Sequence, residues 1–232
     1  MSGAGTPVLA IRPEPGLTST VEAGRALSLP MHGCALSEVS PVAWEMPDLS
    51  RFDALLIGSA NAIRHGGQKL AQLTHMPVHA VGEVTAKEAR AAGFTIERLG
   101  KGGLQTVLDA VDRPVRYLRL VGNEYVDLNW PDGVSFEPVQ VYEVSSRKLT
   151  EDAAKLLQQD VIVLLHSAAM TRQFIAECDR PGVDRSRVTL AAMGERIAEP
   201  ARGALEDSWA AIHISDEPSD TALLAMVAKL CH

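Results

Sequence analysis

Several apolar runs in this sequence end in a glycine or serine, and a helical pattern follows at once. Such a turn presents unpaired backbone N–H groups at the helix start, together with the positive end of the helix dipole. These groups bind carboxylates and phosphates. The candidate starts are Gly58-Ser59-Ala60-Asn61, Gly82-Glu83-Val84-Thr85, Gly122-Asn123-Glu124, Ser167-Ala168-Ala169, Gly194-Glu195-Arg196 and the Gly100-Lys101-Gly102-Gly103 loop. Arg12, Arg64 and Arg172 would add positive charge. Taken singly, each serine is also explained as an N-cap and each glycine as a tight turn.

The other reactive side chains form no catalytic or metal-binding pattern. His166 and Ser167 are adjacent at a strand end, so their side chains point to opposite faces, and no nucleophile-elbow motif surrounds the serine. No glycine-rich nucleotide fingerprint follows a strand. No two His or Cys residues stand on a helix at the i, i+4 spacing of a metal site. We therefore expect no metal and no cofactor.

Strand patterns alternate with helical patterns along the chain. Near-continuous apolar runs occur at residues 8–11, 54–57, 78–81, 115–121, 161–165, 188–193 and 210–214. Helical patterns separate most of them, including one at residues 60–73 and one at 195–206. This alternation is typical of parallel sheets that helices cover on both faces, and it predicts an α/β fold. In such sheets the carboxyl ends of the strands share one edge, where ligands bind.

Two parts of the chain repeat the same order of elements. Residues 53–64 and 160–172 each read as strand, Ser-Ala, helix and Arg, and residues 81–90 and 193–202 share Gly-Glu, two alanines and a final Arg. Ser59 and Ser167 are 108 residues apart, and Gly82 and Gly194 are 112 apart. The repeat predicts two similar α/β domains whose helix starts would line one cleft. Chance similarity between alanine-rich helices remains the alternative.

Two segments interrupt the alternation of strands and helices. Residues 36–46 and 136–144 read as extended, each contains a proline, and neither has a helix of its own. The pattern predicts the two strands of a connecting ribbon.

The amino-acid composition and the net charge limit the kinds of molecule that this protein could bind. The chain has 232 residues, of which 46% are hydrophobic, 22% charged and 4% aromatic, with a net charge of -7. These values exclude a disordered chain and argue against nucleic-acid binding, but not against a small anionic molecule. Three cysteines without a paired motif fit a reducing cytoplasm. No signal-peptide pattern occurs, and no apolar run approaches the roughly 20 residues of a membrane span.

On specific segments the sequence resembles the uroporphyrinogen-III synthase family. The segments follow the family's order and are Arg12-Pro13, FDALLIGSANAIR (52–64), VHAVGEVTAKEARAAGF (78–94), the helix start at Gly103, LRLVGNE (118–124), PVQVYEV (138–144), VIVLLHSAAMTRQF (161–174) and DEPSDTALLAMV (216–227). The most specific is V-G-x-x-T-A-x-x-A-x-x-x-G-F, and V-Y-E-V is the next. Together they span almost the whole chain.

The resemblance implies an architecture and an activity. It implies two flavodoxin-like parallel-sheet domains joined by a two-stranded β ribbon, with a cleft between them. Residues 1–34 plus 147–232 would form the first domain, 48–135 the second, and 35–47 with 136–146 the ribbon. The family cyclises hydroxymethylbilane, a linear tetrapyrrole with eight carboxylates, to uroporphyrinogen III. The reaction loses water, inverts ring D through a spiro intermediate and needs no cofactor.

Site residues follow from the resemblance position by position. Tyr142 in V-Y-E-V matches the family's cleft tyrosine and is expected to help the hydroxyl group leave. The substrate-binding residues would be Arg12, Ser59, Ala60, Asn61, Gly82, Thr85, Gly122, Asn123, Ser167, Ala168 and Gly194. The sequence departs from the family's pattern at Gly58 and at Ile197, where a threonine is usual.

The sequence also supports expectations about location, oligomeric state and binding partners, and it leaves two alternative functions open. A cytoplasmic monomer is expected, with no nucleic-acid or membrane partner and a possible hand-over of substrate from hydroxymethylbilane synthase. Two alternatives stay open: a two-domain homologue that binds tetrapyrroles or other anions without turnover, and an unrelated two-lobed α/β enzyme acting on a sugar or nucleotide. Turnover of hydroxymethylbilane would separate them.

Overall fold

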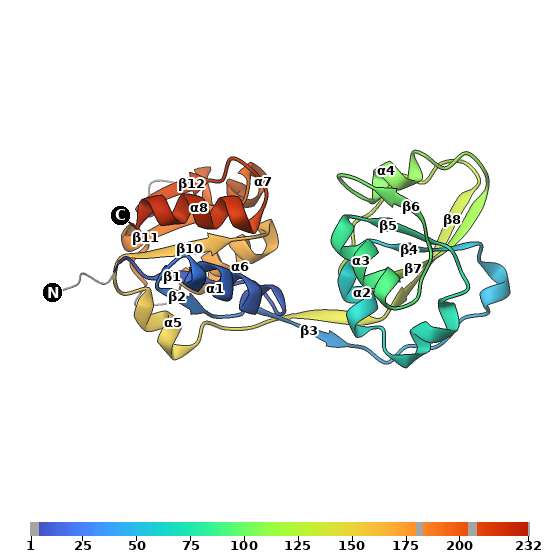
Figure 1. Cartoon of the computed structure of the whole chain (residues 1–232), viewed down its shortest axis with the longest axis horizontal. Helices are drawn as coiled ribbons and strands as arrows, with labels where there is room; N and C mark the ends of the chain where they lie inside the picture. The colour runs from blue at the N-terminus through green and yellow to red at the C-terminus, as the bar shows by residue number, and fades with distance from the viewer. Residues whose placement is uncertain (1–4, 180–182, 204–207, 232) are drawn as a thin grey trace. The chain divides into compact units, whose positions relative to one another are not determined.

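The computed structural model describes residues 5–179, 183–203 and 208–231. The chain forms two compact units, unit 1 from Met1–Glu38 and Ser146–His232 and unit 2 from Val39–Ser145 (Figure 1). Each unit has a five-stranded parallel sheet, and β3 (Ser37–Pro41) pairs with β9 (Tyr142–Ser146) in a two-stranded sheet. The predicted fold class is confirmed. Among the described residues no helix has both the length and the apolar character needed to cross a membrane.

Unit 1 is built on a sheet with the strand order β12-β11-β10-β1-β2. Its strands are β1 (Val8–Ala10), β2 (Met31–Gly33), β10 (Val161–Leu165), β11 (Val188–Ala192) and β12 (Ala211–Ile214). Its helices are α1 (Gly16–Ala26), α5 (Glu151–Leu156), α6 (Ala168–Cys178), α7 (Glu195–Ala198) and α8 (Asp220–Leu230), with 3-10 turns η3 (Arg185–Arg187) and η4 (Glu199–Ala201). In chain order the strands read 2-1-3-4-5, which is the flavodoxin-like order.

The central strand β10 is apolar at every position because both of its faces are buried. Its odd-numbered residues pack against Leu157 and Phe174 on one face of the sheet. Its even-numbered residues pack against Val21 and Leu224 on the other face. Because both faces are covered, no position of this strand faces water, and the two-residue alternation of a half-exposed strand is absent.

Unit 2 is built on a sheet with the strand order β6-β5-β4-β7-β8. Its strands are β4 (Ala54–Ile57), β5 (Val78–Val81), β6 (Ile96–Gly100), β7 (Val115–Val121) and β8 (Val134–Gln140). Its helices are α2 (Ala60–His65), α3 (Glu83–Ala91) and α4 (Leu104–Leu108), with 3-10 helices η1 (Leu49–Arg51) and η2 (Gln68–Leu73).

The two sheets are related by a circular permutation of strand order. If β4 is matched with β10, then β5 and β6 match β11 and β12, while β7 and β8 match β1 and β2. The sequence repeat falls on the first two matched strands and the helices after them. One matched connection differs, since α1 joins β1 to β2 whereas residues 122–133 between β7 and β8 contain no helix.

The second ribbon segment is shorter than the sequence predicts. The assignment of residues 136–140 to the ribbon is wrong, because they belong to β8 and pair with β7 from Phe136↔Tyr117 to Gln140↔Val121. In the first segment, β3 ends at Pro41. Pro138 is tolerated in β8 because this strand is the edge of its sheet, where a missing N–H group leaves no partner unpaired.

Two predicted helices are broken by glycine and proline. The pattern at 60–73 divides into α2 and η2, because Gly67 adopts a left-handed φ of 72° between them. The pattern at 195–206 gives α7 and then η4, where Pro200 has no N–H to continue the α-helical ladder. Residues 204–206 of that prediction lie outside the described residues.

A buried hydrogen bond fixes two strands of unit 2 on the face that α4 covers. The Tyr117 hydroxyl on β7 donates to Nδ1 of His79 on β5 at 2.6 Å, and both residues are almost fully buried. Burial raises the pKa of Tyr117 to about 12, so the phenol keeps its proton. Burial likewise lowers the pKa of His79, which favours the neutral ring that can accept this bond.

We expect Tyr117→Phe to lower the free energy of unfolding by about 1–3 kcal/mol, because Nδ1 of His79 is then buried without a donor. Urea denaturation of the two proteins measures the difference. Tyr125→Phe is the control, since Tyr125 is 43% exposed, and its change should stay within about 0.5 kcal/mol. Equal losses in the two variants would contradict the assignment.

Candidate functional site

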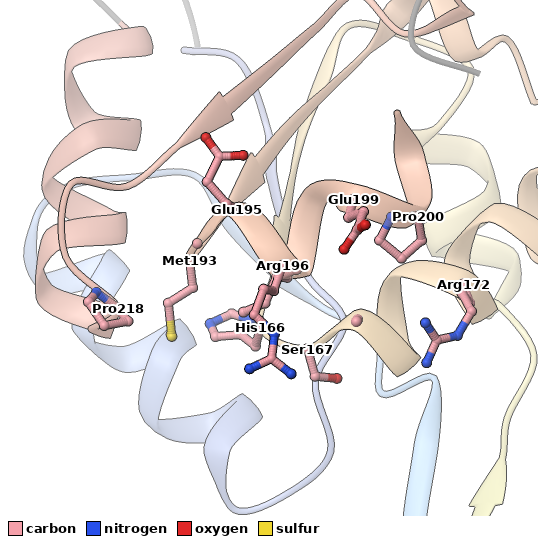
Figure 2. Close-up of a pocket in the computed structure, with 12 residues that line it drawn as sticks. His166, Ser167, Arg172, Met193, Glu195, Arg196, Glu199, Pro200 and Pro218 are labelled. Carbon is pink, nitrogen blue, oxygen red and sulfur yellow. The ribbon is translucent and has the colours of Figure 1, made fainter. Parts of the chain in front are cut away.

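A pocket of about 1050 Å³ lies at the carboxyl edge of the unit 1 sheet (Figure 2). Its lining comes from the residues that follow β10, β11 and β12 and from the helices that begin there. The lining residues are His166, Ser167, Ala168, Arg172, Met193, Gly194, Glu195, Arg196, Ile197, Glu199, Pro200 and Pro218. Three predicted binding residues, Ser167, Ala168 and Gly194, are therefore brought together. This grouping follows from the parallel sheet, in which all the strands end at one edge.

The start of α6 is fixed by side-chain capping. Ser167 has extended backbone angles, and its hydroxyl accepts a hydrogen bond from the Met170 N–H at 3.2 Å, so it is an N-cap. The buried Thr171 hydroxyl donates to the carbonyl of Ile197 at 2.8 Å and ties α6 to the end of α7. The pocket wall at these two helix starts is thus held by hydrogen bonds within the unit.

Gly194 leaves space in front of a strand end. Its φ of 178° is extended backbone that any residue adopts, and no atom lies within 4 Å of a Cβ built on it. Neither conformation nor packing therefore requires glycine at this position. What the missing side chain provides is room above the end of β11, inside the pocket.

One carboxylate in unit 1 accepts hydrogen bonds from three residues that are distant from it in the sequence. Asp220, at the start of α8, accepts hydrogen bonds from Arg12 Nη1 at 2.9 Å, from the Thr20 hydroxyl at 2.8 Å and from His166 Nε2 at 2.9 Å. Burial by itself would raise the pKa of Asp220, but the bonds from His166 and Thr20 and the charge of Arg12 outweigh it and lower the pKa. Asp220 therefore stays ionised. Arg12, predicted to bind substrate, has its Nη1 group engaged by this carboxylate.

Free positive charge remains on the wall of the same pocket. Within the described part of the chain, neither Arg172 nor Arg196 has a hydrogen bond or ion pair. Of the two acidic lining residues, Glu195 pairs with Arg202 at 2.9 Å. The pocket thus presents two unpaired guanidinium groups against one unpaired carboxylate, that of Glu199, and its wall suits an anion.

A smaller pocket of about 190 Å³ lies at the carboxyl edge of the unit 2 sheet. Its lining residues are Gly58, Ser59, Leu104, Arg119, Leu120, Val121, Gly122, Glu124, Tyr125, Val126 and Tyr142. The predicted residues Ser59, Gly122 and Tyr142 are thus brought together, although they are far apart in the sequence. Ala60, Asn61, Gly82, Thr85 and Asn123 are not among the residues that line it.

The Tyr142 ring packs closely against the backbone of Gly122. A Cβ on Gly122 would lie 2.6 Å from Tyr142 Cε2 and 3.1 Å from its hydroxyl oxygen, so only glycine allows this approach. The Asn123 side chain holds the neighbouring strand in place, since it accepts a bond from Val144 N at 2.8 Å and donates to Val144 O at 3.2 Å. Tyr142 is 8% exposed, and no described residue hydrogen-bonds its hydroxyl. The phenol proton is therefore available to a ligand in the pocket.

The other predicted residues of unit 2 have local structural roles. Ser59 caps α2 by accepting from Asn61 N at 3.2 Å, and Ala60 is buried beneath that cap. Gly82 has a left-handed φ of 78° just before α3, and Thr85 is buried within that helix. Arg64, which the sequence offers as a positive group, pairs with Glu88 on α3 at 2.7 Å.

Two residues that line these pockets, Arg119 and His166, were not predicted as site residues from the sequence. Arg119 on β7 is 2% exposed, donates from Nη2 to Val126 O at 2.8 Å and lies under the Tyr125 ring. Its Nη1 is buried and has no partner among the residues that the structure describes. Burial lowers the pKa of Arg119. His166 is the second. A charged residue inside an apolar strand run, or a histidine directly after one, is the signal that would have found them.

Comparisons with known proteins identify the family. The family model described as Uroporphyrinogen-III synthase HemD matches residues 20–225. A search of curated protein sequences finds no significant match.

Solved structures agree on the fold. The uroporphyrinogen-III synthetase of Helicobacter pylori is 19% identical with a TM-score of 0.68, and the alignment covers 97% of this chain and 99% of that one. A mutant uroporphyrinogen-III synthase of Thermus thermophilus is 14% identical with a TM-score of 0.54, covering 97% and 98%. The chain belongs to the uroporphyrinogen-III synthase family, the cyclising hydro-lyases of tetrapyrrole biosynthesis.

Proposed function

We propose that this chain cyclises hydroxymethylbilane to uroporphyrinogen III, with Tyr142 as the proton donor. The observation that carries the proposal is the family match over residues 20–225. The geometry adds a tyrosine that packs against Gly122 in a pocket at a parallel-sheet edge, and its hydroxyl has no hydrogen-bond partner among the described residues. Ligands of open parallel sheets bind at this edge.

The reaction begins when the terminal hydroxyl group leaves. The electron pair of the pyrrole nitrogen expels it, Tyr142 gives its proton to the departing oxygen, and water and an azafulvene cation form. The substituted carbon of ring D attacks this cation to give the spiro intermediate, which fragments and recloses with ring D inverted. Loss of a proton from the ring carbon completes the macrocycle and restores the Tyr142 hydroxyl, so that the only by-product is water.

Most of the catalytic task is control of conformation. Without guidance the bilane closes to the symmetrical isomer I, so the protein must hold the chain in the geometry that leads to the spiro intermediate. The eight carboxylate groups of the substrate give the protein many points at which to bind it. We propose that these groups are bound by Ser59, Ala60, Asn61, Gly82, Thr85, Gly122, Asn123, Ser167, Ala168 and Gly194. Arg12 supports the binding groups through its ion pair with Asp220.

We also infer a cytoplasmic monomer that receives its substrate from hydroxymethylbilane synthase. The location is supported by the sequence, in which the three cysteines Cys34, Cys178 and Cys231 form no paired motif. Hand-over is supported by the chemistry of the substrate, because hydroxymethylbilane that waits in solution is lost to isomer I.

Purified protein given freshly made hydroxymethylbilane should yield uroporphyrinogen III faster than the uncatalysed closure yields isomer I. Chromatographic separation of the oxidised isomers measures the ratio. Isomer I alone, at the rate of the protein-free control, would overturn the proposal. Tight binding of the tetrapyrrole without turnover would instead favour the non-catalytic homologue.

Tyr142→Phe should lower kcat by about 100-fold, the lower end of what a positioned proton donor contributes, while the melting temperature stays near that of the wild type. Tyr117→Phe should show the opposite signature, with lower stability and near-normal turnover of the folded protein. A large stability loss in Tyr142→Phe with unchanged specific activity would show that the tyrosine only packs.

Gly122→Ala tests the packing contact between Gly122 and the Tyr142 ring. The added methyl group would lie 2.6 Å from the Tyr142 ring, so the ring must move, and kcat should fall by roughly tenfold or more. Gly194→Ala is the matched control for sterics, because nothing lies within 4 Å of the added atom within unit 1. We expect it to fold with wild-type stability. Unchanged kcat in Gly122→Ala would contradict the role of this contact.

A further inference from the structure

An exposed tyrosine forms part of the wall of the unit 2 pocket that Tyr142 also lines. Tyr125 is 43% exposed, and the next residue, Val126, is 71% exposed. Both belong to the connection between β7 and β8, and both line the pocket. Single exposed apolar side chains are common on protein surfaces, whereas two adjacent ones on the wall of a pocket point to a ligand.

A buried arginine holds this tyrosine in place. The guanidinium carbon of Arg119 lies 4.7 Å from the centroid of the Tyr125 ring, and its Nη2 donates to the Val126 carbonyl at 2.8 Å. Arg119 is only 2% exposed, and its Nη1 has no hydrogen-bond partner among the described residues. Burying a cation with so few partners is costly. The contacts that Arg119 does make fix the exposed tyrosine and the residue after it.

The arginine is supported in turn by two further aromatic rings. Its guanidinium carbon is 5.6 Å from the centroid of Phe136 on β8, and the rings of Phe136 and Trp130 are stacked with centroids 4.0 Å apart. Phe136 and Trp130 pack against the core on the face of the sheet that α4 covers. Tyr125 is therefore the outermost ring of a series of contacts that reaches the core, and it is held in position before a ligand arrives.

The open part of the Tyr125 ring suits a flat, electron-rich ring. The guanidinium covers one face, so the exposure of this side chain comes from its other face and its edge. A cation draws electron density out of an aromatic ring, and the ring then attracts an electron-rich partner such as a pyrrole on its opposite face. At about 190 Å³ the pocket is smaller than the roughly 300–1,000 Å³ of sites that enclose a drug-sized ligand, so it suits one ring of a tetrapyrrole.

We propose that Tyr125 stacks against one pyrrole ring of the tetrapyrrole substrate and that Arg119 is the positioning residue that holds Tyr125 for this contact. The stacked ring lies in the pocket that Tyr142 lines, so the contact fixes that part of the substrate close to the phenol. The helix starts recognise carboxylates, whereas this contact recognises the pyrrole itself. The inference rests on the proposed function and adds to it a residue that sets specificity for the rings of the substrate.

Binding of uroporphyrinogen III to the full chain tests the contact without turnover. Its pyrrole rings are joined by methylene bridges, so a single ring can turn into a small pocket. Calorimetric titration under nitrogen, which keeps the ligand reduced, gives the Kd. Tyr125→Ala should raise Kd roughly fivefold or more, in line with what a stacked aromatic pair contributes. Tyr125→Phe keeps the ring and should restore Kd to within about twofold of the wild type.

Three further variants separate the ring from apolar area, from general effects and from charge. Tyr125→Leu keeps an apolar side chain without an aromatic face, so it should bind as weakly as Tyr125→Ala, and it replaces that variant if Tyr125→Ala does not fold. Leu27→Ala removes a 51% exposed side chain of unit 1 and should keep the wild-type Kd. Arg119→Lys keeps the positive charge but loses the planar group against the ring. Its Kd should rise about twofold or more, and not rise further when it is combined with Tyr125→Ala.

Wild-type affinity in Tyr125→Ala or Tyr125→Leu would overturn the inference, and so would a Tyr125→Phe variant that binds as weakly as Tyr125→Ala. No binding of uroporphyrinogen III by the wild type would also overturn it. A rise in Kd on Arg119→Lys that persists in the Tyr125→Ala background would refute the positioning role of the arginine. The isomer assay answers separately for the proposed function. Production of isomer III together with equal Kd values would refute the stacking contact alone, whereas production of isomer I alone would refute the activity.

Discussion

The rest of this protein depends on the constraint that each of its main sheets is parallel and covered by apolar contacts on both faces. Helices or loops must then return the chain to the same end of the sheet after every strand. All the strands therefore end at one edge, and the polar turns between strand and helix gather there. Both pockets lie at such an edge because the strand ends bring glycine turns, capping serines and free N–H groups together there.

Many of the polar groups at the two pockets already form hydrogen bonds or ion pairs that stabilise the fold. The hydroxyl groups of Ser59 and Ser167 cap helices, and Arg12 is paired with Asp220. Among the described residues, the pocket groups without a protein partner include the Tyr142 hydroxyl, Nδ1 of His166, Nη1 of Arg119 and the guanidinium groups of Arg172 and Arg196. A free donor in a pocket gains a full hydrogen bond when a ligand arrives, whereas a capping hydroxyl must share the one it has. We therefore propose proton donation by the unpartnered Tyr142 hydroxyl, whereas the hydroxyl groups of Ser59 and Ser167 also hold their helices in place.

The permuted relation between the two sheets explains how far the sequence repeat extends. Residues 53–90 and 160–202 match because both encode a central strand, its helix and the next strand outward. The third pair of strands, β6 and β12, follows in both units, but β7 and β8 correspond to β1 and β2, which lie at the other end of the chain. A repeat read in one direction along the sequence cannot continue through that point. The connection between β7 and β8 also lacks a helix like α1 of unit 1, and the Tyr125 ring lies over Arg119 there.

The sequence by itself determined the α/β class, the repeat, the family and the positions of most strand ends, because buried strands and tight turns leave local patterns of apolar residues, glycine and serine. It placed Ser59 and Gly122 at strand ends and Tyr142 in the ribbon, without showing that the three share a pocket. Only the tertiary structure decided that β8 joins the sheet, because Pro138 fits a ribbon and a sheet edge equally well. It alone brought Asp220 to Arg12, 208 residues away, and to His166. Contacts at such separation depend on how the sheets close, and no local periodicity records them.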